Sequence, residues 1–290
     1  MEYPQIIQLF KNSYFPPDIL RGLSMALDDI GEKPIIVRSS SLLEDRLGTS
    51  FSGKYKSLFL ANQGPKRDRL NALTDAIAEV YASTFGPDPI EYRAERGLLD
   101  FYEEMGILIQ EVVGNSVGKY FLPTFAGVAF SNNEFRWSPR IQREDGLIRL
   151  VPGLGTRAVD RTSNDYPVLV APGKPALKVN ITPDDTARYA PQKIDVINME
   201  LNAFETIDIK DFLKEFGRDL PGITQIASTY ERNMLRPATG MTSYEQEDIV
   251  VTFDSLRERT NFITQMQVIL KTLKEKIGTQ IGRASCRERV

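Results

Sequence analysis

The order of helical and strand-like patterns limits this chain to a mixed architecture. Apolar residues recur at helical spacing over 17–30, 66–85 and 261–277, and a further helix is expected over 89–105. The intervening sequence carries short apolar or alternating runs that predict strands. These runs lie at 34–37, 106–113, 124–131, 134–140, 147–152, 166–173 and 195–209. The runs at 124–131 and 134–140 are expected to pair as a hairpin. Helical, then mixed, then strand-rich segments favour an α+β fold with two lobes.

Composition narrows the classes of protein that fit. The chain has 290 residues, of which 41% are apolar and 26% charged, enough for one large domain or two smaller ones. No apolar run reaches the length of a membrane span, and the N-terminus lacks a signal-peptide pattern, so we expect a cytoplasmic protein. The net charge of -3, without basic blocks, predicts neither nucleic acid nor membrane as a partner.

The chain contains no histidine and one cysteine. This excludes a Ser-His-Asp triad, a histidine-containing zinc site and an internal disulfide. The cysteine lies in the last ten residues, IGRASCRERV, which resemble an in-frame translation of a sequencing adapter. We therefore expect residues 281–290 to be an artefact, and the coding sequence to be interrupted near residue 280.

Residues 34–57, PIIVRSSSLLEDRLGTSFSGKYKS, place Arg38 at the end of a short apolar strand, before a loop rich in serine and glycine. Two interpretations of Arg38 stay open. Glu44 or Asp45 could pair with it structurally, or its two-pronged guanidinium could hold phosphate oxygens with help from the serines. In the second case, Gly53 would let the backbone approach the ligand closely.

Gln110 and Glu111 interrupt an otherwise apolar strand over 106–113. Buried polar groups without partners are costly, so either the strand lies at a sheet edge or these residues bind a ligand such as a purine. The glycine-rich stretch VPGLGTRAVDR at 151–161 fits neither the GxGxxG pattern nor the P-loop spacing, and is a weak signal alone.

Together these segments resemble the N-terminal nucleotide-binding domain of the phosphoenolpyruvate synthase and pyruvate, phosphate dikinase family. The stretch VRSSSLLEDRLGTSFSG resembles its VRSS, ED and SFAG elements, while ILIQEVV, FAGVAFS and VPGLGTRAV resemble its hinge strand, SGVAF and GLGE segments. The resemblance implies a two-lobed ATP-grasp-like fold, incomplete at the C-terminus, with Arg38 as candidate catalytic residue. It also implies ATP contacts at Arg38, Gly53, Ser57, Leu58, Gln110 and Glu111.

Three features depart from the family pattern. No GGKGA-type segment with a phosphate-binding lysine precedes residue 34, and Thr156 stands at the position of the GLGE glutamate. The closing acidic strand with its Q-x-R pair is also missing. Mg²⁺ is expected from the family, yet its ligands are not identifiable in this sequence.

The sequence divides into a helical segment at 1–33, a first lobe at 34–113, a strand-rich second lobe at 114–280 and the adapter-like 281–290. The resemblance implies ATP-dependent phosphoryl transfer to a histidine on a phosphohistidine domain, with a pyruvate-binding domain as a further partner and pyruvate as final acceptor. Without these domains we expect no activity from the chain alone. Two alternatives stay open: a non-catalytic nucleotide sensor, or the ATP domain of a small-molecule kinase, for example an antibiotic kinase.

Overall fold

The computed structural model describes residues 2–41, 43, 54–102, 104–159, 165–244, 248–277 and 284–287. Residues 277 and 284–287 are described by their backbone alone. The chain divides into two compact units, Met1–Val112 with Ile197–Phe204, and Val113–Val196 with Glu205–Val290. Helices combine with sheets built of antiparallel strand pairs. This confirms the predicted α+β class.

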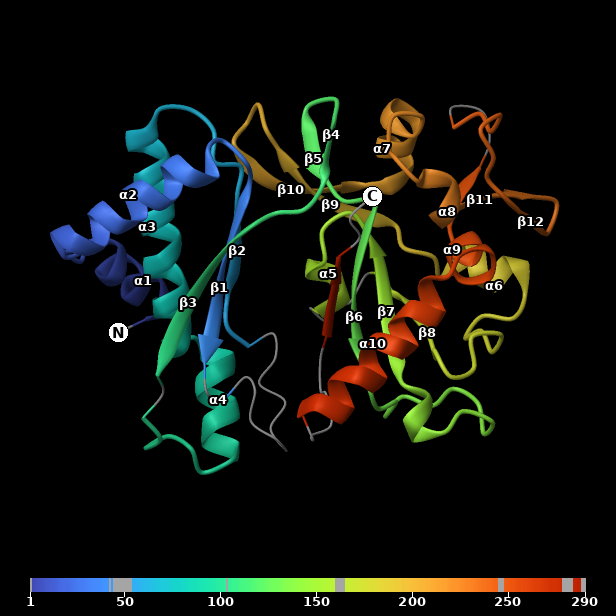
Figure 1. Cartoon of the computed structure of the whole chain (residues 1–290), viewed down its shortest axis with the longest axis horizontal. Helices are drawn as coiled ribbons and strands as arrows, with labels where there is room; N and C mark the ends of the chain where they lie inside the picture. Colours follow the sequence, from blue (N-terminus) through green and yellow to red (C-terminus); the bar gives the residue numbers. More distant parts are fainter. Residues whose placement is uncertain are drawn as a thin grey trace. The chain divides into compact units, whose positions relative to one another are not determined.

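The first unit is a three-stranded sheet with helices against it (Figure 1). Its strands run in the order β2-β1-β3, and both pairs are antiparallel. Its elements are α1 (Tyr3–Lys11), α2 (Pro17–Ile30), β1 (Ile35–Ser41), β2 (Ser57–Leu60), α3 (Lys66–Ala82), a 3-10 turn (Ser83–Phe85), α4 (Pro87–Glu95) and β3 (Met105–Glu111).

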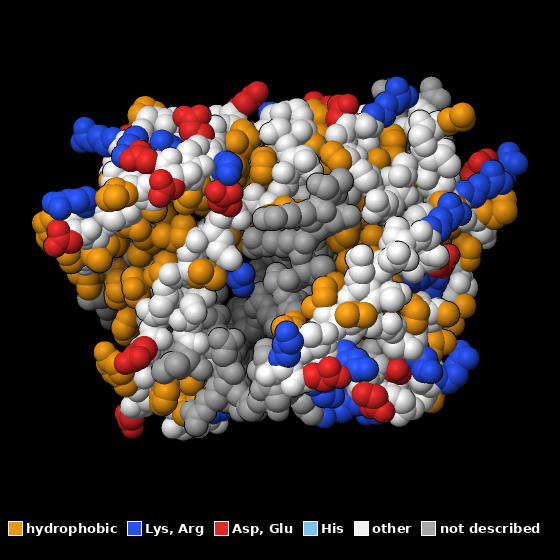
Figure 2. Space-filling view, in the orientation of Figure 1, with side chains coloured by type: hydrophobic (Ala, Val, Ile, Leu, Met, Phe, Trp, Pro, Cys, Tyr) orange, Lys and Arg blue, Asp and Glu red, His pale blue; other side chains and the backbone are white. Residues whose placement is uncertain are grey.

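Helices α2 and α3 form where the spacing of apolar residues predicts them. Pro17 occupies the first turn of α2, and Gly31 ends it with φ +69°. The buried residues Leu27 of α2 and Leu73 and Ile77 of α3 pack against Ile35 of β1 and its neighbours. Burial of these side chains fixes both helices on one face of the sheet. Figure 2 shows further hydrophobic side chains gathered on the outer surface of α1 and α2.

Two predicted boundaries in this unit are wrong. β1 does not end at Arg38 but continues to Ser41, because β3 pairs with it as far as Met105. Cross-strand pairing thus overrides the weak strand preference of serine. The helix expected over 89–105 ends at Glu95, since Gly97 adopts φ +64° and leaves the helical conformation.

The second unit contains three sheets, in the orders β10-β9-β5-β4, β14-β6-β7-β8 and β12-β11-β13. The turn between β9 and β10 belongs to the first unit. The strands are β4 (Asn115–Val117), β5 (Tyr120–Leu122), β6 (Phe125–Phe130), β7 (Leu147–Pro152), β8 (Val168–Val170), β9 (Lys193–Asn198), β10 (Ala203–Asp208), β11 (Ala227–Glu231), β12 (Met234–Pro237), β13 (Ile249–Val251) and β14 (Ala284–Arg287). The helices are a 3-10 turn (Arg143–Asp145), α5 (Thr156–Val159), α6 (Pro183–Arg188), α7 (Ile209–Phe216), α8 (Ile223–Ile226), α9 (Asp254–Arg259) and α10 (Phe262–Ile277).

One apolar core joins these sheets to the C-terminal helices. At its centre, the fully buried Phe125 of β6 meets Phe253 and Phe262 edge to face, with ring centroids 5.9 Å and 5.6 Å away. The hairpin predicted between 124–131 and 134–140 is wrong, because β6 pairs with β7 and residues 134–140 form no strand. The last helix, α10, ends as predicted at Ile277.

Residues 281–290, which we predict from the sequence to be an artefact, include the short strand β14. Its backbone pairs antiparallel with β6, from Ala284 opposite Ala129 to Arg287 opposite Ala126. Among the described residues, no helix is both long enough and apolar enough to cross a bilayer.

Candidate functional site

The sheet of the first unit has one face covered by helices, and its other face carries both polar and apolar side chains. Side chains alternate along a strand, and those of Ile35, Val37, Leu58, Leu60, Ile107 and Ile109 pack in the helix-side core. The residues between them therefore point to the opposite face. We call this set the open face: Ile36, Arg38, Ser40, Ser57, Phe59, Gly106, Leu108 and Gln110.

The strand register brings three of the predicted site residues together on the open face. Arg38 pairs with Ser57 of β2 on one side and with Leu108 of β3 on the other. Gln110 lies two residues beyond Leu108 on the same face, which makes it a diagonal neighbour of Arg38. A guanidinium, a hydroxyl and an amide are thus held within reach of one small ligand.

Arg38 occupies the middle strand of this sheet and is half-buried. Within the described part of the chain it makes no hydrogen bond or ion pair. Glu44 and Asp45, the alternative structural partners, lie outside the described residues. A guanidinium that is always charged and has five N–H donors is suited to bidentate binding of phosphate or carboxylate oxygens.

Gln110 lies on an edge strand and not on the buried strand expected from its apolar neighbours. β3 is the last strand of the order β2-β1-β3, and Leu108 is 43% exposed. The edge position therefore explains both polar residues without a ligand, and ligand binding by Gln110 stays a prediction. Gln110 is exposed, and its amide can both donate and accept hydrogen bonds.

The remaining predicted residues do not join this group. The Leu58 side chain packs in the helix-side core, so only its backbone is available to a ligand. Glu111 points to the helix side, and its carboxylate binds the Lys33 ammonium at 3.0 Å. Gly53 lies outside the described residues.

A charge cluster supports the open face from the helix side. Glu79 of α3 binds both Lys11 of α1, at 2.8 Å, and Lys56, at 2.7 Å. Burial alone would raise the pKa of Glu79, but the hydrogen bonds and charges of the two lysines outweigh it and lower the pKa. Lys56 directly precedes Ser57, so this cluster anchors the start of β2.

In the second unit, the glycine-rich loop after β7 is held by a buried carboxylate. Thr156 donates a hydrogen bond to Asp195, which also accepts one from Thr206 at 2.6 Å. Gly153 adopts φ +67°, and a Cβ there would lie 2.5 Å from the Asp195 carbonyl oxygen. Asp195 is not among the site residues predicted from the sequence. A polar residue inside an apolar run, the signal that pointed to Gln110, also occurs here as an aspartate in KIDVIN.

The next residue of the loop, Arg157, is also bound within the unit. Its guanidinium Nε lies 3.1 Å from the Asp165 carboxylate, and both side chains are at least nine-tenths buried. Asp165 additionally accepts hydrogen bonds from the backbone N–H groups of Gln192 at 2.9 Å and Lys193 at 3.2 Å. The polar side chains of this loop therefore fix its own conformation.

The described residues offer no cluster of three or more metal-ligating side chains. Mg²⁺ is commonly held by one or two carboxylates together with substrate phosphates, so a preformed cluster is not required for it.

A family model described as the pyruvate phosphate dikinase AMP/ATP-binding domain matches residues 1–280. The chain belongs to this family of ATP-grasp-like nucleotide-binding domains, which confirms the predicted family and fold and shows that ATP or AMP is the ligand class. No protein with curated annotation matches the chain.

Proposed function

We propose that this chain is the ATP-binding domain of a phosphotransferase, and that Arg38 on the open face holds the phosphates of ATP. The observation that carries the proposal is Arg38, a half-buried residue that makes no hydrogen bond or ion pair with any described residue. A cation beside a hydroxyl and an amide matches a ligand with a polyanionic end and a polar ring.

The three residues have distinct roles in this proposal. Arg38 binds phosphate oxygens and stabilises the negative charge that develops on the transferred phosphoryl group. Ser57 adds a hydroxyl beside it, and the Gln110 amide binds the edge of the adenine. The predicted backbone contacts of Gly53 and Leu58 stay part of this proposal, whereas Glu111 does not, and Mg²⁺ bound with the nucleotide would neutralise phosphate charge.

The family and one feature of the sequence support a histidine on another domain as the acceptor of the phosphoryl group. The chain has no histidine. A phosphohistidine intermediate therefore requires a histidine outside these 290 residues, on a phosphohistidine domain that passes the group on towards pyruvate. The ATP domain of a small-molecule kinase would show the same open face, and only the acceptor domain separates the two.

A non-catalytic nucleotide sensor is the second candidate function. The observation in its favour is the Thr156 hydroxyl, which is bound to Asp195 where the family pattern has a glutamate. A loop fixed in this way can bind nucleotide without contributing a carboxylate to phosphoryl transfer. Titration with ATP and ADP, each with and without Mg²⁺, separates the two functions, since a sensor is indifferent to the γ-phosphate and to the metal.

Arg38→Lys tests the phosphate role directly. Lysine keeps the charge but loses the two-pronged geometry, so we expect ATP affinity to fall about tenfold to a hundredfold, from about 1.5–3 kcal/mol for a charge-assisted contact. The melting temperature should stay the same. The matched control is Arg21→Lys, at an exposed arginine of α2. Calorimetric titration with ATP measures the affinity, and an unchanged affinity for Arg38→Lys would contradict the proposal.

A further inference from the structure

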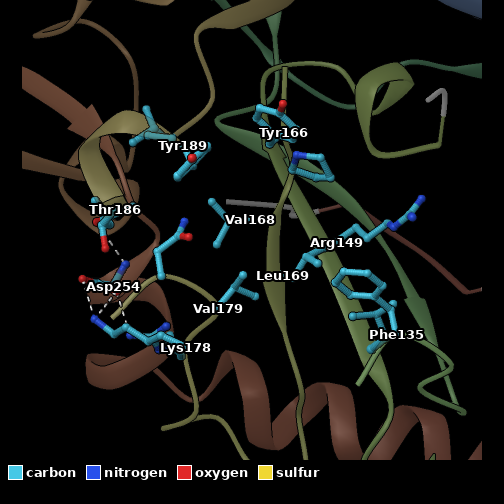
Figure 3. A pocket seen from close by; sticks show the side chains of 17 residues that line it. Phe135, Arg149, Tyr166, Val168, Leu169, Lys178, Val179, Thr186, Tyr189 and Asp254 are labelled. Carbon is cyan, nitrogen blue, oxygen red and sulfur yellow. Dashed lines mark hydrogen bonds and ion pairs between the residues drawn. The ribbon is translucent and has the colours of Figure 1, made fainter. Parts of the chain in front are cut away.

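The second unit contains a pocket that none of the predicted site residues lines. Its volume is about 370 Å³, within the range of small-molecule sites. It lies beside β8, and Figure 3 shows side chains from several segments around it. The apolar surface of this pocket and the partners of its polar groups indicate which class of ligand it can bind.

One part of the pocket is aromatic and apolar. Tyr166 and Tyr189 meet edge to face with ring centroids 6.0 Å apart, and they are 53% and 42% exposed. Val168 and Val179 lie near them in the pocket (Figure 3). Exposed tyrosine rings and branched aliphatic side chains form a surface against which an apolar ring can be buried.

The main charged side chains of the pocket are bound to one another. Asp254 binds Lys178 at 2.9 Å and Arg257 at 2.7 Å, and Glu258 also contacts both cations. The hydrogen bond from Arg257 lowers the pKa of Glu258, so this carboxylate is charged at neutral pH. Two cations therefore face two anions, and this cluster offers no uncompensated charge to a ligand.

Arg149 is the remaining charged residue that lines the pocket. Its guanidinium donates a hydrogen bond to the Ala158 carbonyl at 3.4 Å, and Figure 3 shows it directed away from Val168 and Val179. An ionised group of a ligand would lose its hydration in this pocket without gaining an opposite charge. The charged residues therefore disfavour both anionic and cationic ligands.

The uncharged polar side chains of the pocket differ from the charged ones. Within the described part of the chain, the half-buried Asn180 amide makes no hydrogen bond, and neither do the hydroxyls of Tyr166 and Tyr189. All three residues line the pocket. Because an amide both donates and accepts, Asn180 can form hydrogen bonds with an amide or a hydroxyl of a ligand.

We propose that this pocket binds an uncharged small molecule, an apolar ring that carries an amide or a hydroxyl group. The ring packs against Tyr166, Tyr189 and the two valines, and the polar group forms hydrogen bonds with the Asn180 amide. None of these contacts involves a residue of the open face.

The probe for this site is indole-3-acetamide, measured by calorimetric titration of the whole chain. Indole-3-acetate and tryptamine have the same ring but carry a negative and a positive charge, which makes them matched controls. We expect indole-3-acetamide to bind saturably at one site, and both charged compounds to bind at least tenfold more weakly. Equal binding of the three compounds, or no binding of indole-3-acetamide, overturns the proposal.

Two variants locate the binding. Asn180→Ala removes the hydrogen-bonding amide and Tyr189→Ala removes a ring contact, so each should weaken indole-3-acetamide about two- to tenfold. The matched controls are Asn71→Ala, at an exposed position of α3, and Tyr14→Ala, at a tyrosine that is 79% exposed. Both controls should leave the affinity unchanged.

Melting temperatures of the four variants show whether each one is folded during the titration. If Asn180→Ala and Tyr189→Ala are folded and bind indole-3-acetamide as well as their controls do, the probe occupies another site and the proposal is wrong.

A further titration separates this site from the nucleotide site. Arg38→Lys should leave the affinity for indole-3-acetamide unchanged while it weakens ATP binding. Saturating ATP should likewise leave indole-3-acetamide bound. If ATP displaces the probe, the pocket is not a separate site and the proposal is wrong.

Discussion

The open face of the first unit and the glycine-rich loop of the second unit are both predicted from the sequence to be nucleotide-binding segments, but they use their polar side chains differently. Arg38 on the open face makes no hydrogen bond or ion pair with any described residue. In the loop, Thr156 and Arg157 are bound by the buried carboxylates Asp195 and Asp165.

This difference separates residues that are available to a ligand from residues that hold the fold. A charged side chain that has no partner among the described residues can form its hydrogen bonds and ion pairs with a ligand instead. A buried polar group that is fully hydrogen-bonded contributes to stability and to the geometry of its loop. Substitutions on the open face should therefore reduce affinity, while substitutions around the loop should reduce stability.

The largest effect is expected for Asp165→Ala. It leaves the buried Arg157 guanidinium without its carboxylate, and loss of one partner of a buried pair costs about 3–5 kcal/mol. Urea unfolding should show this loss in the free energy of unfolding. Asp219→Ala, at an exposed aspartate of the same unit, is the control. Equal stability of the two variants would remove the distinction between the loop and the open face.

Asp195→Asn is expected to have the next largest effect. Asparagine keeps one acceptor oxygen and replaces the other with an NH2 group that only donates, so one of Thr156 and Thr206 loses its acceptor and about 1–3 kcal/mol of stability should be lost. Asp219→Asn again serves as the control. If ATP affinity measured well below the melting temperature falls more for Asp195→Asn than for Arg38→Lys, the loop takes a larger part in binding than the open face.

Gln110→Ala should reduce ATP affinity about two- to tenfold, the value of one neutral hydrogen bond of about 0.5–1.5 kcal/mol. Its thermal stability should stay close to that of the unsubstituted protein, since Gln110 is exposed on an edge strand. Gln8→Ala, at an exposed position of α1, is the control. A drop in melting temperature without a change in affinity would assign Gln110 to the fold instead of the site.

The smallest effect is expected for the ion pairs of Glu79, which lie on the helix side of the sheet. The pKa of Glu79 is lower in the folded protein than in the unfolded chain, so its ion pairs stabilise the fold above about pH 4.3. This contribution, about 1 kcal/mol, is lost as the pH falls below that value and through the lower folded pKa. Glu79→Gln should remove this part of the acid dependence of unfolding, whereas Glu95→Gln, at an exposed glutamate of α4, should leave it in place.

Much of the fold is predictable from local pattern. The helices α2, α3 and α10 and the strands β6 and β7 follow from apolar periodicity, glycine and proline, which act over a few neighbouring residues. The errors arise where pairing between distant segments determines the length or the partner of a strand. The pairing of β1 with β3 lengthened β1 beyond Arg38, and β6 took β7 as its partner instead of residues 134–140.

For the predicted site residues, too, the local sequence gives one part of the information and the tertiary structure the other. The sequence singled out Arg38, Ser57 and Gln110 one by one, but only the register places them on one face of a sheet. The local sequence does not show that Leu58 points into the core or that Glu111 binds Lys33. The face on which each side chain lies depends on which side of the sheet the helices cover.

The sequence by itself determined the family, the α+β class and the residue types available for chemistry, since motif spacing, periodicity and the absence of histidine are properties of the chain alone. Tertiary structure decided which polar side chains have partners. Asp195 and Thr156 are 39 positions apart in the chain yet hydrogen-bonded, and no local rule predicts such a contact. Pairing over that distance depends on the strand order and on the packing of the whole unit, which many weak interactions set together.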